Sequence, residues 1–233
     1  MVQAPGCGGS LISPTVVLSA AHCRGQGVGA RLIINAYRLN DPTTNGTVER
    51  TVIRAISHPQ YNPVTDDNDF MVLVLDEPVT TIDPIEVNFN ERMPSAGQEL
   101  RVIGFGGVSA GISASLILRE VDVSVFDNGV CRRRSPFPNF NPNIIFCAVG
   151  ENGNKDACRG DSGGPIFSLR NGVANELVGV VSYGNDGFIC GAEDNMGFYA
   201  RTSGVEDWLS PMICTPPRPS RPPRRECRGI TRR

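Results

Sequence analysis

Metal-site and membrane-span patterns are scarce in this sequence, and their scarcity argues against two classes of protein. The chain contains only two histidines, and none of its eight cysteines lies in a C-x-x-C pair. This argues against a cysteine–histidine zinc framework, so we expect no bound metal. The apolar runs reach about the length of FMVLVL at 70–75. A helix that crosses a membrane needs about 20 apolar residues, so we expect no membrane span.

The start of the chain also lacks the basic residues and apolar core of a secretory signal peptide, since it reads MVQAPGCGGS. The cysteines point the other way. Their even number favours disulfides over reduced, buried thiols, and disulfides imply an oxidising compartment. Counting does not establish which cysteines pair.

Charge is unevenly distributed along the chain. The formal net charge is −2, yet residues 215–233 carry seven arginines and one glutamate. This segment, TPPRPSRPPRRECRGITRR, is proline-rich and poor in apolar residues, so we expect a disordered, solvated tail. A flexible, solubilising extension is the favoured interpretation, and a polyanion-binding element is the alternative. The rest of the chain is acidic, and we predict no nucleic-acid partner.

Short β-rich segments, separated by Gly, Pro, Asn and Asp, make up most of the chain. ELRVIGFG, REVDVSVF and NELVGVVSYG are examples. Their length, alternation and β-branched content are typical of antiparallel strands in a barrel or sandwich. A soft boundary near 94–99 separates two strand-rich halves.

One helix is predicted, within SGVEDWLSPMIC at 203–214. Ser203 is its expected N-cap, and Pro211 weakens or kinks it. The apolar residues that share one face of this helix are Val205, Trp208, Leu209 and Met212.

Three residue types needed for acyl transfer occur in suggestive places. Ser162 lies in DACRGDSGGP, whose glycines permit a tight turn; Asp69 precedes the apolar run FMVLVL; and His22 follows another apolar run in LSAAHC. A serine hydroxyl needs an imidazole to take its proton, and the imidazole needs a carboxylate to hold its tautomer. The other histidine, His58, lies in the turn-like SHPQY. Taken singly, each of these residues is more often structural, and the prediction rests on their conjunction.

Four segments resemble, in order, the signature segments of the chymotrypsin/trypsin family of serine endopeptidases: CGGSLISPTVVLSAAHC, DNDFMVLVL, DACRGDSGGP and VVSYG. The resemblance runs from about Cys7 to Cys214 and keeps the family's chain order of His, Asp and Ser. It implies an all-β fold of two packed antiparallel six-stranded β-barrels, with a C-terminal helix and no cofactor. The implied protease domain covers 1–214, with barrels over about 1–97 and 98–202, a helix over about 203–213, and the tail at 215–233.

The resemblance also implies a role for individual residues. His22 would be the general base, Asp69 would orient it and Ser162 would be the nucleophile. The backbone amides of Gly160 and Ser162 would form the oxyanion hole. Ser182 would support Asp69 and border the substrate-binding site.

Asp156 predicts the specificity, because the family has the base of its substrate pocket at this position. A carboxylate there pairs with Arg or Lys, so the implied reaction is hydrolysis after Arg or Lys. Gly184 and Gly197 match the small residues that keep such a pocket open. Two departures qualify the match: about two extra residues precede Cys190, and Met196 replaces the common Pro or Tyr.

The family pattern also implies disulfide pairs. The pairs it implies are Cys7 with Cys23, Cys131 with Cys147, and Cys158 with Cys190. Cys214 and Cys227 remain, and they pair only by elimination.

The resemblance further implies activation by cleavage, after which an Ile or Val amino terminus pairs with the Asp before the nucleophile, here Asp161. The usual Ile-Val-Gly-Gly is missing, and MVQAPGCGG resembles a strand that begins about a dozen residues later. We therefore expect a truncated sequence and a truncated N-terminal strand, with Met1 an internal methionine. Without that terminus Asp161 would be a buried, unpaired carboxylate. The alternative function is therefore an inactive protease homologue that acts as a binding or regulatory protein.

The remaining expectations follow from the same family. We expect a secreted zymogen, a monomer that acts on proteins and peptides, with protein protease inhibitors as candidate partners. Asn45 is a candidate glycosylation site in Asn45-Gly46-Thr47. Arg159-Gly160-Asp161 reads as an adhesion tripeptide, but in the family this Asp is buried, so we interpret it as accidental.

Overall fold

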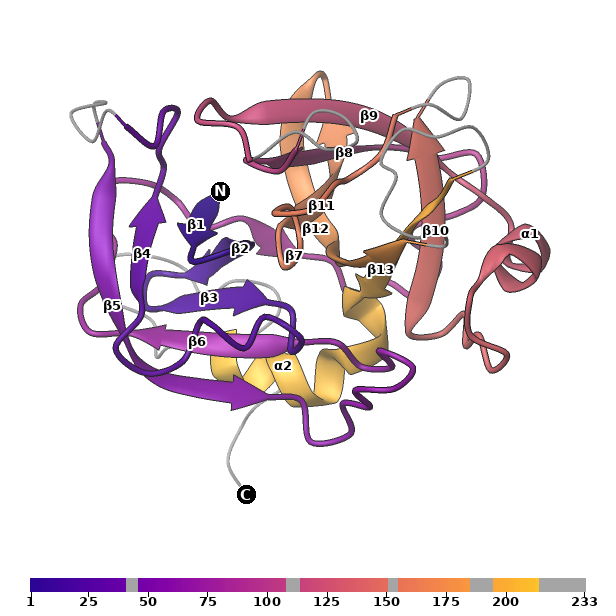
Figure 1. Cartoon of the computed structure of the whole chain (residues 1–233), viewed down its shortest axis with the longest axis horizontal. Coiled ribbons are helices and arrows are strands. Elements are labelled where there is room, and N and C mark those ends of the chain that lie inside the picture. The colour runs from indigo at the N-terminus through magenta and orange to yellow at the C-terminus, as the bar shows by residue number, and fades with distance from the viewer. Residues whose placement is uncertain (41–45, 108–113, 151–154, 185–194, 214–233) are drawn as a thin grey trace.

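Two β-barrels lie side by side in the computed structural model, which describes residues 1–40, 46–107, 114–150, 155–184 and 195–213 (Figure 1). The first barrel closes in the order β1-β2-β3-β6-β5-β4. Its strands are β1 (Val2–Ala4), β2 (Cys7–Ser13), β3 (Val16–Ser19), β4 (Arg31–Ile34), β5 (Val48–Ser57) and β6 (Met71–Leu75).

The second barrel closes through the pairing of β11 with β12, in the order β11-β8-β9-β10-β13-β12. A short strand, β7 (Glu86–Val87), adds to β12 in parallel. The barrel strands are β8 (Glu99–Gly104), β9 (Arg119–Val125), β10 (Ile145–Gly150), β11 (Pro165–Arg170), β12 (Val173–Gly184) and β13 (Gly197–Arg201). The predicted all-β fold of two antiparallel six-stranded barrels is confirmed.

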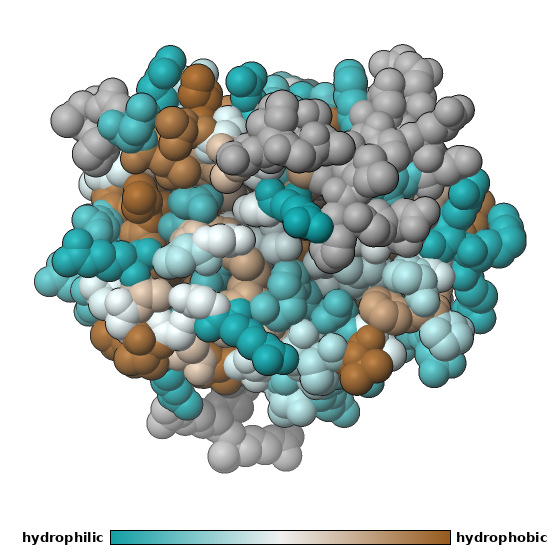
Figure 2. All heavy atoms as spheres, viewed as in Figure 1, coloured by the Kyte–Doolittle hydropathy of each residue, from teal (hydrophilic) through white to brown (hydrophobic). Residues whose placement is uncertain are grey.

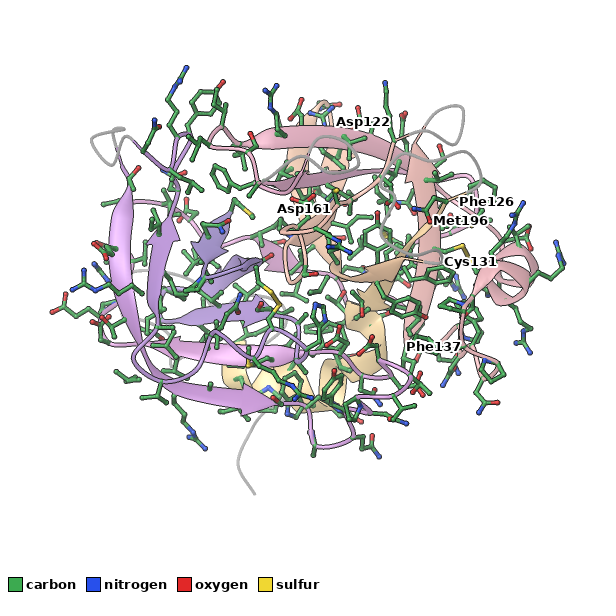
Figure 3. All side chains as sticks on the ribbon, in the orientation of Figure 1. Asp122, Phe126, Cys131, Phe137, Asp161 and Met196 are labelled. Atoms are coloured by element: carbon green, nitrogen blue, oxygen red, sulfur yellow. A yellow bond between two sulfur atoms is a disulfide. The ribbon has the colours of Figure 1, made fainter. Side chains whose placement is uncertain are left out.

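Apolar and polar residues alternate along several strands, and this alternation determines which side of each strand faces the core. In β8, Leu100 and Val102 are buried, whereas Arg101 points outward. Arg101 lies opposite Asp122 of β9 in the ladder, and its guanidinium donates two hydrogen bonds to that carboxylate, which Figure 3 labels. In contrast, β6 is buried along nearly its whole length, so its sequence MVLVL is apolar throughout.

A helix that the sequence analysis did not predict, α1 (Asn128–Arg134), follows β9. It begins because the side chain of Asp127 accepts hydrogen bonds from the amides of Gly129 and Val130, which are otherwise unpaired at a helix start. Its arginines at 132–134 are exposed. Figure 2 shows hydrophilic side chains over this helix, at the right of the view.

The C-terminal helix begins later than predicted. A 3-10 turn, η2 (Thr202–Val205), precedes α2 (Glu206–Ile213), and Pro211 lies inside α2. The prediction that Ser203 caps the helix was wrong, because Ser203 lies within η2 and its buried hydroxyl has no hydrogen-bond partner in the described part of the chain. Leu209 and Ile213 pack into the core of the first barrel. Among the described helices, none is long and apolar enough to cross a membrane.

Candidate active site

The pairing of two strands brings His22 and Asp69 together. Strands β3 and β6 are antiparallel, with Ser19 opposite Met71. The residues that follow β3 therefore leave the barrel at the edge where β6 begins. His22 lies three residues beyond Ser19 and Asp69 lies two residues before Met71, so both occupy this edge.

The carboxylate of Asp69 is fully buried and accepts three hydrogen bonds. Its Oδ1 accepts the backbone amide of His22 at 2.9 Å, and its Oδ2 lies 2.7 Å from Nδ1 of the same residue. The hydroxyl of Ser182, on β12 of the other barrel, donates to Oδ2 at 2.5 Å. This arrangement holds the proton of His22 on Nδ1, which leaves Nε2 free to accept one.

Two opposing effects act on the imidazole of His22. Burial lowers its pKa, while the hydrogen bond and charge of Asp69, and the charge of Asp66, raise it. The result is a pKa above the ordinary value for histidine. His22 therefore needs a higher pH than a free histidine before it can act as a base.

Backbone contacts on both sides hold the turn that carries Ser162. The carbonyl of Ser162 accepts the amide of Gly8 at 2.7 Å, and the amide of Gly163 donates to Val181 at 2.9 Å. Gly163 has φ +77°, and a Cβ there would come within 2.3 Å of the hydroxyl of Ser19. The turn thus packs against the end of β3, just before His22, and only glycine fits this close approach.

The resemblance implies that two amides of this turn form the oxyanion hole. Within the described residues, neither the amide of Gly160 nor that of Ser162 donates a hydrogen bond. No hydrogen bond joins Ser162 to His22 in the described structure either. Catalytic hydrogen bonds are often long without substrate and shorten only in the complex, so this does not argue against the pair.

Asp161 belongs to the same turn and is labelled near the junction of the barrels in Figure 3. Its carboxylate is buried, and it accepts the amide of Gly106 at 2.8 Å and that of Cys158 at 2.9 Å. Burial raises its pKa, and these two hydrogen bonds oppose that rise. No salt bridge involves Asp161 among the residues that the structure places.

Asp156, Gly184 and Gly197 come together, as the sequence analysis expects. The two glycines face each other in the β12–β13 ladder. A Cβ on Gly197 would come within 2.4 Å of Oδ1 of Asp156, so a larger residue would displace the carboxylate. Asp156 accepts its hydrogen bonds from the amide of Ala157 and, at 3.3 Å, from the hydroxyl of Tyr199. Burial raises the pKa of Asp156 to about 7.

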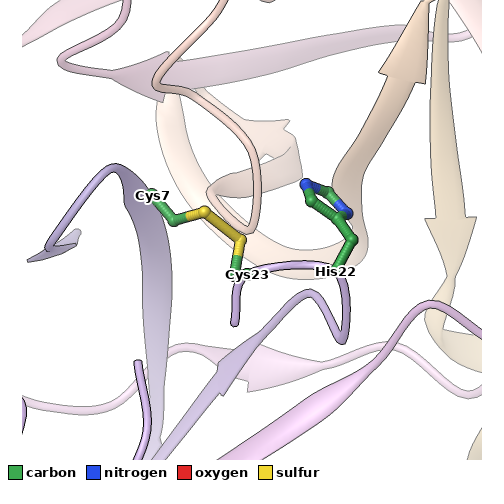
Figure 4. A group of neighbouring side chains, drawn as sticks. All are labelled: Cys7, His22 and Cys23. Carbon is green, nitrogen blue, oxygen red and sulfur yellow. A yellow bond between two sulfur atoms is a disulfide. The ribbon is translucent and has the colours of Figure 1, made fainter. Parts of the chain in front are cut away.

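Two of the implied disulfides lie wholly within the described residues, Cys7–Cys23 and Cys131–Cys147. Cys158 is also disulfide-bonded. Figure 4 shows His22 beside the Cys7–Cys23 bond. The three side chains are close enough to hold a metal ion, but the disulfide leaves no thiolate to bind one. Four residues of the sequence analysis lie outside the described part of the chain, namely Asn45, Cys190, Cys214 and Cys227.

The comparisons with known proteins agree with this geometry. The family model named Trypsin matches residues 1–209. This chain belongs to the trypsin family of serine endopeptidases.

Individual relatives of this trypsin-family chain support the same assignment. Trypsin-1 of Salmo salar is 33% identical over 88% of this chain and 79% of its own length. The serine protease filzig of Drosophila melanogaster is 36% identical over 87% of this chain, which spans only 12% of filzig. A solved structure of neuropsin, a serine protease expressed in the limbic system of mouse brain, has a TM-score of 0.77 and 26% identity, covering 90% of this chain and 89% of its own. The resemblance noted in the sequence is confirmed.

Sequence reasoning missed three residues of this site. Tyr199 and Gly106 were missed because each acts through one hydrogen bond that only the folded chain reveals. Asp66 was missed although it lies only three residues before Asp69 in the sequence. One carboxylate oxygen of Asp66, one of Asp69 and a ring nitrogen of His22 all lie within 4.8 Å of one another. The run of acidic residues before β6 was the available signal.

We predict that Asp66→Asn moves the acid limb of the pH–activity profile to lower pH. The base must be neutral, so activity falls as the pH drops through the pKa of His22. Removing the charge of Asp66 lowers that pKa, and the loss then begins at lower pH. Asn suits the position, since Asp66 has φ +53°. The measurement is kcat/KM against pH, with the neighbouring Asp67→Asn as matched control; equal profiles for both variants would refute the effect.

Proposed function

We propose that this chain hydrolyses peptide bonds after Arg or Lys, with Ser162 as nucleophile, His22 as general base and Asp69 as its orienting partner. The observation that carries the proposal is the 2.7 Å contact between Nδ1 of His22 and the buried carboxylate of Asp69. This contact leaves Nε2 as the base.

In the first step the hydroxyl oxygen of Ser162 attacks the substrate carbonyl carbon while Nε2 of His22 takes its proton. The carbonyl oxygen becomes an oxyanion, which the amides of Gly160 and Ser162 stabilise. Such a donor contributes about 3–4 kcal/mol in comparable sites. The intermediate collapses as His22 returns the proton to the leaving amine, which gives an acyl-enzyme on Ser162.

In the second step water replaces the leaving amine. His22 takes a proton from the water, whose oxygen attacks the acyl carbon, and the same amides bind the second oxyanion. Expulsion of the Ser162 oxygen, reprotonated by His22, releases the new carboxylic acid. Asp69 orients the imidazole and stabilises the imidazolium that forms twice in each cycle.

The placement of Asp156 supports the specificity. A guanidinium that reaches this buried carboxylate would gain a paired, charge-assisted contact in a site from which water is largely removed. It would also lower the pKa of Asp156, because an opposite charge favours the ionised form.

The wider setting follows from the same site. The partners we propose are proteins and peptides with an exposed Arg or Lys, together with protein inhibitors that present such a residue to the pocket. The disulfides support secretion, since they persist in oxidising compartments. We expect the protease domain to act as a monomer.

Labelling by a serine-directed fluorophosphonate tests the nucleophile. We expect one labelled site in the natural protein, with labelling abolished in Ser162→Ala and strongly reduced in His22→Ala. Ser168→Ala, at a buried serine on β11 outside the site, is the matched control and should label normally.

Two results would count against this proposal. Labelling that survives in Ser162→Ala would mean that another serine reacts. A natural, mature protein that binds no fluorophosphonate would favour the inactive homologue that serves as a binding protein.

A further inference from the structure

A hollow of about 1010 Å³ lies apart from the proposed catalytic residues, none of which lines it. It is bordered by the turn after β5, the segment before α1, and the chain from the end of β13 into α2. The lining residues that matter here are His58, Glu91, Asp127, Arg201, Glu206 and Trp208, together with Ser203 and Asp207.

The charge of this pocket is strongly negative for its size. Four carboxylates line it, those of Glu91, Asp127, Glu206 and Asp207, against the single guanidinium of Arg201. None of the four forms a salt bridge among the described residues. The basic side chains nearest in sequence, Arg92 and those at 132–134, are not part of the lining.

Within the described residues, the guanidinium of the lining makes its contacts with backbone carbonyls and an aromatic ring, and with none of these acids. Nη1 of Arg201 donates to the carbonyls of Met93 and Pro94, and the guanidinium lies 5.2 Å from the ring centroid of Phe146. One oxygen of Asp127 is also used, since it caps α1. Glu91, Glu206 and Asp207 are left exposed and free to attract a positively charged occupant.

The pocket also offers flat apolar surfaces. The half-buried ring of Trp208 packs edge-on against His58, with centroids 4.8 Å apart. Pro59, Pro94 and Pro142 line the same hollow. Aromatic surfaces of this kind are where proline-rich, extended segments dock in proteins.

Two buried donors beside the pocket have no acceptor among the described residues. Nε of Arg201 and the hydroxyl of Ser203 make no hydrogen bond there, although the two residues are only 6% and 8% exposed. A buried polar group left unpaired costs about 1–3 kcal/mol. An occupant that carries free carbonyl oxygens would remove this cost, provided that it reaches these donors.

One segment of this chain is positively charged, rich in proline and expected to carry free carbonyl oxygens, and so matches the pocket in all three respects. Residues 214–233 follow directly after Ile213, the last residue of α2, and contain seven arginines, one glutamate and five prolines. Proline-rich segments favour an extended form whose carbonyls are unpaired. Helix α2 is about 12 Å long, and twenty extended residues reach about 60 Å, so length does not prevent a return to the pocket.

We propose that the acidic pocket beside α2 binds the arginine-rich segment 214–233 of the same chain. The arginines pair with Glu91, Glu206 and Asp207, and the prolines pack on Trp208. Bound in this way, the segment is shielded from trypsin-like cleavage after Arg224 and Arg225, which do not precede proline.

The test uses Trp208, the single tryptophan of the chain, as reporter. Acrylamide quenching of its fluorescence is measured in the full chain carrying Ser162→Ala, which prevents self-cleavage. Replacing Arg218, Arg221, Arg224 and Arg225 by Gln should raise the quenching constant about twofold or more. In the chain with its natural tail, 1 M salt should also raise the quenching constant, because the screening length of charge interactions falls to about 3 Å.

Matched variants decide the outcome. Glu206→Gln with Asp207→Asn should reproduce the tail variant, whereas Glu86→Gln with Glu99→Gln, outside the pocket, should not. Neutralising the arginines at 132–134 should also have no effect. Equal quenching in the tail variant and the parent, with no response to salt, would overturn the proposal. Protection of Trp208 from acrylamide that grows with protein concentration would also overturn it, because the bound tail would then belong to a second copy of the chain.

Discussion

Replacing Asp69 by Asn should lower kcat by about 10⁴-fold, although it exchanges only one carboxylate oxygen for an NH2 group. Three donors surround the carboxylate: the backbone amide of His22, Nδ1 of His22 and the hydroxyl of Ser182. An amide side chain must place its NH2 group at one of the two oxygen positions. At Oδ1 it would meet the backbone N–H of His22, donor against donor, which is unfavourable.

The NH2 group would therefore take the Oδ2 position, where the hydroxyl of Ser182 can turn and accept from it. There it donates to Nδ1 of His22 and forces the imidazole proton onto Nε2. A protonated Nε2 cannot accept the proton of Ser162, so the geometry survives while the base is lost. Asp69→Asn should also remove the charge that holds the pKa of His22 above its ordinary value.

The measurement is kcat on an Arg-containing peptide substrate, normalised to the concentration of folded protein. Asp67→Asn is the matched control and should stay within a few-fold of the parent. A loss below about tenfold in Asp69→Asn would mean that another group orients His22.

The residues of the site that lie next to a strand end could be predicted from the sequence. His22 and Asp69 each adjoin a long apolar run, and Ser162 lies in a glycine-rich turn with few other interpretations. These local patterns are independent of how the barrels pack. Tyr199 could not be found in this way, because its role depends on Asp156, which faces it only in the folded chain.

Strands β2 and β11 have sequences at odds with ordinary strand signals. Strand β2 (CGGSLIS) is rich in Gly and Ser, yet it is buried along its whole length because neighbours approach its backbone closely. At Gly8 a Cβ would come within 2.9 Å of the backbone of Gly164. Strand β11 begins at Pro165, which usually argues against a strand interior. Tertiary contacts, rather than local propensity, determine both.

The charge at Asp156 should decide which substrates this protease selects. Asp156→Ser removes the carboxylate and should lower kcat/KM for Arg substrates by roughly 10²–10³-fold, since breaking a buried, hydrogen-bonded charge pair costs several kcal/mol. The hydroxyl of Tyr199 donates to this carboxylate, and in Asp156→Ser it can donate to the introduced serine hydroxyl instead. Substrates with an apolar residue before the cleaved bond should be cut no more slowly.

The pH dependence of the preference for Arg over apolar substrates separates the titration of Asp156 from that of His22. Burial raises the pKa of Asp156 to about 7 in the empty pocket. The carboxylate is ionised above this pKa and neutral below it, so attraction for a guanidinium should weaken as the pH falls through about 7. The ratio of kcat/KM for an Arg substrate to that for an apolar one cancels the titration of His22, which serves both. We expect this ratio to rise with pH in the parent and to be flat in Asp156→Ser. A ratio that is flat in both would show that Asp156 does not contact the substrate cation.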